Sequence, residues 1–190
     1  VLTACSEFKA YDQTGELSLS FNCENEYQTK GETIDINSFS VTITSLTDGS
    51  KIEYAHYIDI PQVVKLTPGD YTVSVASADV MPAAFNQPVY GGSADFTIVA
   101  GTITTATVNC TLQNVKVTIV PGETFLEEMK SFSVVVSNGE GNGHTLVWEK
   151  SDVNNGLKDG YFSVAPLTIH VDGYRSDNDA PATFDLVVSD

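Results

Sequence analysis

The sequence predicts an all-β protein made of two tandem β-sandwiches with about seven strands each. Apolar and polar residues alternate along most of the chain, and Pro, Gly, Asn and Asp interrupt the alternation at short intervals, as in a protein of strands and turns. The second half also repeats the first: residues 131–136 (SFSVVV) match residues 38–43 (SFSVTI), and residues 182–184 (ATF) echo residues 94–96 (ADF). Such a repeat indicates two copies of one domain.

The first copy is assigned to residues 15–112, and its first strand has Leu17, Leu19 and Phe21 on one face. The remaining strands are expected at residues 39–43, 51–54, 62–66, 71–76, 93–99 and 102–112. A Thr-Pro-Gly-Asp turn within residues 66–75 predicts a hairpin there, because Pro presets its φ angle and Gly tolerates positive φ.

The segment 78–92 is the longest stretch of the first copy without a strand pattern. It is rich in apolar residues, and Pro82 and Pro88 stiffen it. We expect Phe85 and Tyr90 to close one end of the first sandwich, whereas an exposed Tyr90 ring would suit stacking on a sugar.

The second copy is assigned to residues 113–190 and begins directly after the last strand of the first, with no flexible linker. Its one helical segment is expected at residues 124–130. The strand at 184–188 has no counterpart of strand 102–112 after it, so the second sandwich is one strand short. Three explanations are open: the chain continues beyond Asp190, the division into strands is wrong, or a strand from another subunit fills the gap.

The first residues carry the most specific short motif. Leu2, Thr3, Ala4 and Cys5 resemble the lipobox of a bacterial lipoprotein, in which a peptidase cuts before a cysteine whose sulfur has been acylated. Residues 1–14 are therefore interpreted as a lipobox remnant and N-terminal tether, and acylated Cys5 is expected to attach the chain to a membrane. The alternative is a chance match.

Charge restricts the class of partner. Twenty-five acidic residues against nine basic ones give a net charge of −16, which repels phosphate backbones. The single arginine, Arg175, is too few for the bidentate contacts that nucleic-acid recognition uses. We therefore expect no nucleic-acid partner.

No motif for catalysis is visible. His56, His144 and His170 are far apart in the sequence, and the Gly-x-Ser-x-Gly motif is absent. The glycines within residues 138–143 lie between two expected strands rather than before a helix, so they do not form a phosphate-binding loop. We expect no enzymatic activity and no cofactor.

Cys23 and Cys110 both lie in or beside expected strands. In an oxidising compartment they could pair as a disulfide, and otherwise they are two small buried thiols. Metal binding is not favoured, because no second cysteine pair or nearby histidine completes a tetrahedral set.

Two acidic loops and four aromatic residues are further candidates. The loops, which offer oxygen ligands to calcium but match no complete calcium motif, contain Asp152, Asn154, Gly156 and Asp159, and Asp177, Asn178 and Asp179. Asx turns between strands explain the same residues without a metal. The aromatic candidates for stacking on a sugar are Tyr90, Trp148, Tyr161 and Tyr174.

Three segments carry a family resemblance: residues 66–73 (LTPGDYTV), 85–91 (FNQPVYG) and 110–117 (CTLQNVKV). Together with the lipobox they resemble surface lipoproteins of Gram-negative gut anaerobes, a domain of unknown function akin to fimbrillins. This resemblance implies an acylated precursor, two transthyretin-like or immunoglobulin-like sandwiches, and location at the outer membrane or cell surface. It also implies a cell-adhesion or pilus role, with pilin-like partners joined by strand donation.

One departure from fimbrillins concerns processing, which in shaft subunits occurs after an arginine beyond the first strand. Arg175 is the only arginine here, and Lys30 is the nearest basic substitute. An uncut, lipid-anchored chain suits an anchor or cap better than a shaft. The alternatives are an accessory lipoprotein that binds host or dietary glycans and a spacer for a missing C-terminal module. Exposed coplanar aromatics would favour glycans, and an apolar groove beside residues 184–188 would favour strand donation.

Overall fold

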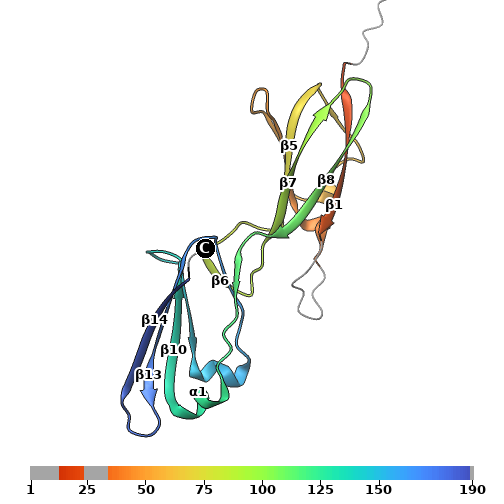
Figure 1. Cartoon of the computed structure of the whole chain (residues 1–190). Coiled ribbons are helices and arrows are strands. Elements are labelled where there is room, and N and C mark those ends of the chain that lie inside the picture. The colour runs from red at the N-terminus through yellow and green to blue at the C-terminus, as the bar shows by residue number, and fades with distance from the viewer. Residues whose placement is uncertain (1–12, 24–33, 189–190) are drawn as a thin grey trace, which may run out of the picture. The chain divides into compact units, whose positions relative to one another are not determined.

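The computed structural model describes residues 13–23 and 34–188, so Cys5 and Lys30 lie outside the described residues (Figure 1). Two compact units are present: unit 1 combines the described residues up to 77 with residues 91–111, and unit 2 combines residues 78–90 with those from 112 onward. The described residues form fourteen strands and one short α-helix, which confirms the all-β prediction. None of their helices has the length and apolar character needed to span a membrane.

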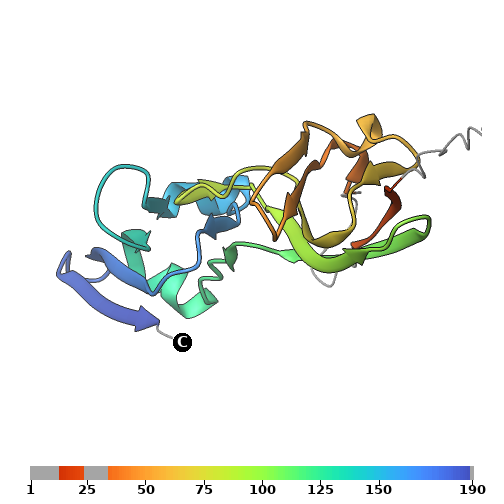
Figure 2. The same ribbon diagram turned by 90° about the horizontal axis from the view of Figure 1, so that it is seen from above.

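Unit 1 contains seven strands that form one sheet in the order β3-β2-β5-β7-β8-β1-β4. They are β1 (Gly15–Cys23), β2 (Ser40–Ser45), β3 (Lys51–Tyr54), β4 (Val64–Leu66), β5 (Gly69–Ala76), β7 (Tyr90–Ile98) and β8 (Ile103–Leu112). Seen from above, these strands surround one core (Figure 2). Alternation directs Leu17, Val41, Val73 and Val108 into that core, where each is almost fully buried. Two short 3₁₀ turns, Ile36–Ser38 and Tyr57–Asp59, complete the unit.

Strands β1 and β8 are parallel neighbours, although most sheet contacts of the chain are antiparallel. Their register runs through eight pairs, from Glu16 with Ile103 to Cys23 with Cys110. The two cysteines therefore stand opposite each other, and both are present as thiols.

The prediction of a hairpin at residues 66–75 is wrong. Strand β4 pairs with β1, whereas β5 pairs with β2 and β7, so the turn leads from one part of the sheet to another. The Tyr71 hydroxyl lies 2.9 Å from the Thr67 carbonyl oxygen, to which it donates a hydrogen bond, and this contact closes the turn. Turn residues specify the reversal of the chain but not which strands pair across it.

Unit 2 is a sandwich of a four-stranded sheet, β11-β10-β13-β14, and a three-stranded sheet, β6-β12-β9. Its strands are β6 (Ala83–Phe85), β9 (Val115–Val117), β10 (Met129–Ser137), β11 (Thr145–Glu149), β12 (Gly160–Phe162), β13 (Leu167–Arg175) and β14 (Pro181–Val188). A helix is present where residues 124–130 predict one, as α1 (Glu123–Glu128), but it ends two residues earlier because Met129 begins β10. A 3₁₀ helix spans Lys150–Asn155. Phe132, Val136, Trp148 and Phe162 form the centre of the core between the sheets.

The segment 78–92 does not close the end of the first sandwich. Its residues 83–85 form β6, which pairs with β12 inside unit 2. The buried Asn114 side chain fixes the following residues, since its Oδ1 accepts from the Val89 amide at 3.2 Å and its Nδ2 donates to the Gln87 carbonyl at 2.9 Å. A three-residue strand has too little alternation to be recognised in the sequence.

Candidate functional site

Strand β14 forms an open edge of unit 2 (Figure 1). It pairs with β13, and none of the other described strands pairs with its second edge. Phe184, Leu186 and Val188 are register partners of the core-facing Val171, Ile169 and Leu167. The three β14 side chains nevertheless remain 47–54% exposed. Apolar side chains on the core side of an edge strand, left open to solvent, are typical of a docking surface.

A groove runs along this open side. Its cavity measures about 360 Å³, and its lining includes Val120, Pro121, Phe125, Ile169, Val171 and Phe184. None of the described residues that line it is charged. The groove therefore offers an apolar surface beside an unpaired strand edge, which is the combination that an added β-strand occupies.

Unit 1 shows what fills the equivalent place. The sequence repeat aligns Phe184 of β14 with Phe96 of β7. Strand β7 has β5 on one side and β8 on the other, whereas β14 has only β13 among the described strands. Strand β8 is therefore the strand of the first copy that has no counterpart among the described strands of the second.

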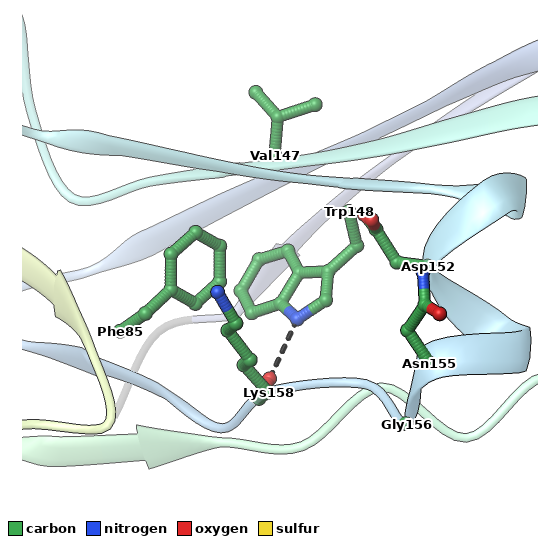
Figure 3. Close-up of a pocket in the computed structure, with 7 residues that line it drawn as sticks. All are labelled: Phe85, Val147, Trp148, Asp152, Asn155, Gly156 and Lys158. Carbon is green, nitrogen blue, oxygen red and sulfur yellow. Dashed lines mark hydrogen bonds between the residues drawn. The ribbon is translucent and has the colours of Figure 1, made fainter.

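A second cavity, of about 310 Å³, lies beside Trp148 (Figure 3). The indole N–H of Trp148 donates to the Lys158 carbonyl at 2.7 Å, and the Phe85 ring meets the indole edge-on at 5.1 Å between centroids. The Lys158 side chain extends toward the Phe85 ring, with its ammonium 5.9 Å from the ring centroid (Figure 3). Trp148 is only 1% exposed, so the floor of this cavity belongs to the core.

The four aromatic candidates do not form a platform for sugar. Trp148 and Tyr161 are buried, and Tyr90 is half-buried. Only Tyr174 has an open ring, at 53% exposure, on the outer face of the four-stranded sheet. One exposed ring is not the coplanar set that a sugar-stacking surface needs.

In the first acidic loop, the two carboxylates have structural partners. Asp152 accepts a hydrogen bond from the Glu149 amide at 2.9 Å and caps the 3₁₀ helix. Asp159 lies 2.7 Å from the Lys116 ammonium and accepts from the Thr118 hydroxyl at 2.6 Å. Burial opposes the charge of Asp159, but Lys116 and Thr118 outweigh it, so the pKa of Asp159 is lowered. Asn154 is exposed within the same 3₁₀ helix.

The polar side chains of the second acidic loop also have partners within the protein. Asp177 lies 3.2 Å from the Arg175 guanidinium, Asp179 lies 2.7 Å from the Lys130 ammonium, and Asn178 accepts from the Ala180 amide at 2.9 Å. Within residues 13–23 and 34–188, no group of three or more histidine, cysteine or acidic side chains could hold a metal ion. An Asx-type turn at Asn178 fits the second loop, whereas the first loop is held by the capped 3₁₀ helix and the contacts of Asp159.

One polar cluster was not apparent from the sequence. On the outer face of the four-stranded sheet, His170 Nδ1 lies 2.6 Å from Asp185, and His170 Nε2 lies 3.7 Å from Asp172. The Ser133 hydroxyl donates to Asp172 at 3.1 Å rather than to the histidine. A serine nucleophile needs a base that accepts its proton, and here the imidazole is not that partner. Three separate strands contribute these residues, so no sequence motif could reveal them.

Comparisons with known proteins give a family and several structural neighbours. A model of the family described as domain of unknown function DUF4493 matches residues 13–190. No curated protein sequence matches the chain. The solved structures that resemble it include a candidate adhesin from Bacteroides ovatus, with 11% identity, 97% of this chain and 88% of that chain covered, and a TM-score of 0.45. A polysaccharide-binding candidate from Bacteroides thetaiotaomicron has 9% identity, 90% and 80% coverage, and a TM-score of 0.46. A candidate cell-adhesion protein from the same species has 11% identity, 92% and 88% coverage, and a TM-score of 0.43.

Proposed function

The chain belongs to the DUF4493 family, and we propose that it acts as a non-catalytic adhesion or pilus-related protein of the cell surface. In this proposal, unit 2 binds by accepting a β-strand from another polypeptide segment along β14. The observation that carries it is the apolar groove beside the open β14 edge. The orientation of Ser133 toward Asp172, away from His170, supports a binding role rather than catalysis.

Addition of a strand beside β14 would pair its free backbone edge and bury its exposed apolar side chains at the same time. The outward backbone N–H and C=O groups of β14 would gain hydrogen-bond partners. Phe184, Leu186 and Val188, about half exposed, would lose their contact with water. Burying the remaining surface of three such side chains contributes on the order of 3 kcal/mol, before the cost of association. Backbone pairing supplies affinity, and the groove selects a strand with small or apolar residues at alternate positions.

A peptide from the chain itself can test this proposal. The peptide has the sequence of residues 102–112, with Cys110→Ser to prevent oxidation. In unit 1 this segment forms the strand that pairs with β7, which is the place equivalent to the open side of β14. When this peptide is added to the full chain, we expect alternate β14 amides to exchange hydrogen at least about tenfold more slowly. Hydrogen-exchange mass spectrometry measures this protection.

The controls separate groove binding from unspecific association. A shuffled peptide of the same composition lacks the alternation and should give no protection. The double variant Phe184→Ser/Leu186→Ser removes two half-exposed apolar side chains from the core side of β14, one of which lines the groove, and should lose the protection. Asp185 lies on the opposite face of the same strand, so the variant Asp185→Ser should retain the protection. Equal protection by both peptides, or none by either, would contradict the proposal.

Lipid attachment at Cys5 is the second part of the proposed function. It rests on the Leu-Thr-Ala-Cys motif alone and would hold the protein at the outer membrane. Intact-mass measurement of the membrane-extracted protein is expected to show the added mass of two or three acyl chains, because one chain anchors only marginally. Cys5→Ser should move the protein to the soluble fraction. An unmodified Cys5, or unchanged fractionation of the variant, would remove the anchor from the proposal.

A further inference from the structure

Cys23 and Cys110 form the last register pair of the parallel strands β1 and β8. Neighbouring strands lie about 4.8 Å apart, which is inside the Cα separation of about 4.4–6.8 Å that a disulfide spans. Alternation directs the side chains of both residues toward the inner face of unit 1, because Leu17 and Val108, at positions of the same parity, are buried there. The two thiols are therefore on the same side of the sheet.

Side chains on the outer face fix this register independently. The hydroxyls of Ser20 and Thr107 lie 2.8 Å apart, and the Asn22 amide donates to the Asn109 side-chain oxygen at 3.4 Å. Each of these contacts joins a register pair, and together they precede the cysteines along the same two strands. A slip by one residue would break both contacts and would move the apolar side chains of β1 to the outside.

The two sulfurs differ in accessibility. Cys110 is buried, whereas Cys23 is half-buried at the end of its strand. Burial, together with the hydrogen bond with Cys23, raises the pKa of the Cys110 thiol to about 12. Cys23 is therefore the thiol that an external reagent reaches and that reacts first.

We propose that Cys23 and Cys110 are an oxidisable pair that forms an intrachain disulfide and fastens β1 to β8. The thiolate of Cys23 attacks an external disulfide, such as glutathione disulfide or the active-site disulfide of an oxidoreductase, and one thiol of the oxidant leaves. The Cys110 thiol then loses its proton and attacks the Cys23 sulfur. The second thiol of the oxidant leaves, so two electrons and two protons pass from the cysteines to the oxidant.

The disulfide would join β1 covalently to β8, so that β1 could not separate from unit 1. It closes a loop that includes β2, β3, β4, β5, β7 and also β6 of unit 2. Closing so long a loop restricts the unfolded chain and stabilises the folded unit. Strand exchange in unit 1 is then blocked at β1. This inference concerns unit 1 and stands whether or not β14 of unit 2 accepts a strand.

Tryptic peptide mapping tests the proposal directly, because Lys9 separates Cys5 from Cys23. The full chain is exported to the periplasm of a bacterial host, treated with N-ethylmaleimide and digested without reductant. Cleavage places Cys5, Cys23 and Cys110 in the peptides 1–9, 10–30 and 66–116. We expect peptides 10–30 and 66–116 to be joined, with the mass of two hydrogens missing. The variant Cys5→Ser should give the same joined pair.

Thermal unfolding provides the second measurement. Reduction of the wild-type chain should lower the Tm of unit 1 by about 10 °C or more, whereas Cys23→Ser should be unaffected by reductant. Cys23 is half-buried at a strand end, so this variant is expected to fold. The proposal is overturned if both cysteines carry the maleimide label and excess glutathione disulfide still yields no joined peptide. Joining of peptide 1–9 to either partner would overturn it as well.

Discussion

Replacing Trp148 with alanine is expected to lower the free energy of unfolding of unit 2 by about 3–5 kcal/mol. The indole is fully buried at the centre of the core and packs edge-on against Phe85. Its removal leaves a large cavity, and it also leaves the Lys158 carbonyl without the 2.7 Å hydrogen bond from the indole. Urea denaturation followed by circular dichroism measures the change, since the variant lacks the only tryptophan.

Two further variants make this result interpretable. Trp148→Phe keeps much of the packing but loses the hydrogen bond, so it should cost less than Trp148→Ala. Tyr174→Ala removes an exposed aromatic ring from the same unit and should change the unfolding free energy by no more than about 0.5 kcal/mol. If Trp148→Ala unfolds at the same urea concentration as the wild type, Trp148 does not hold the core together.

Gly92→Ala is expected to destabilise unit 1 by about 3 kcal/mol, at the upper end of the usual cost of overpacking. Strand β7 passes so close to β8 at this point that an added Cβ would lie 2.2 Å from the Asn109 carbonyl oxygen and 3.2 Å from its carbon. These are backbone atoms, so the contact is relieved only by separating the two strands. Differential scanning calorimetry should show a lower transition temperature for unit 1.

Gly122→Ala is the matched control for this substitution. Gly122 precedes α1 with an ordinary φ of −70°, and an added Cβ would meet no heavy atom within 4 Å. Gly122 is the N-cap of α1, where alanine is less favourable than glycine, so we expect a cost of no more than about 1 kcal/mol. Equal stability of the two alanine variants would mean that β7 and β8 are not packed this closely.

Local patterns were sufficient to predict most strands and the second copy of the fold. The alternation of Leu17, Leu19 and Phe21 corresponds to β1, and the Gly-rich residues 138–143 join β10 to β11 as expected. The open side of β14 was also predicted, because the repeat showed which strand would have lacked a neighbour. These features depend on residues close together in the sequence or on comparison between the two copies.

The features that the sequence did not reveal depend on partners distant in the sequence. Strand β6 is only three residues long, and it is a strand because it pairs with β12, which is distant in the sequence. The candidate calcium ligand Asp159 is instead held by Lys116 and Thr118 on the neighbouring β-segment. Trp148 resembled a ligand-binding aromatic, yet it is central to the core because β11 places it between the sheets. Tertiary packing decides such cases, and composition cannot reveal it.

The parallel pairing of β1 and β8 has a mechanical consequence. Strand β1 begins at Gly15, and β8 ends at Leu112, beside one of the three places where the chain crosses between the two units. In parallel strands these two points lie at opposite ends of the pair, so traction between the membrane and unit 2 would shear β1 along β8. All eight register pairs would then resist together rather than opening one after another. With the lipid anchor proposed at Cys5 in place, this parallel pairing is where unit 1 would resist pulling.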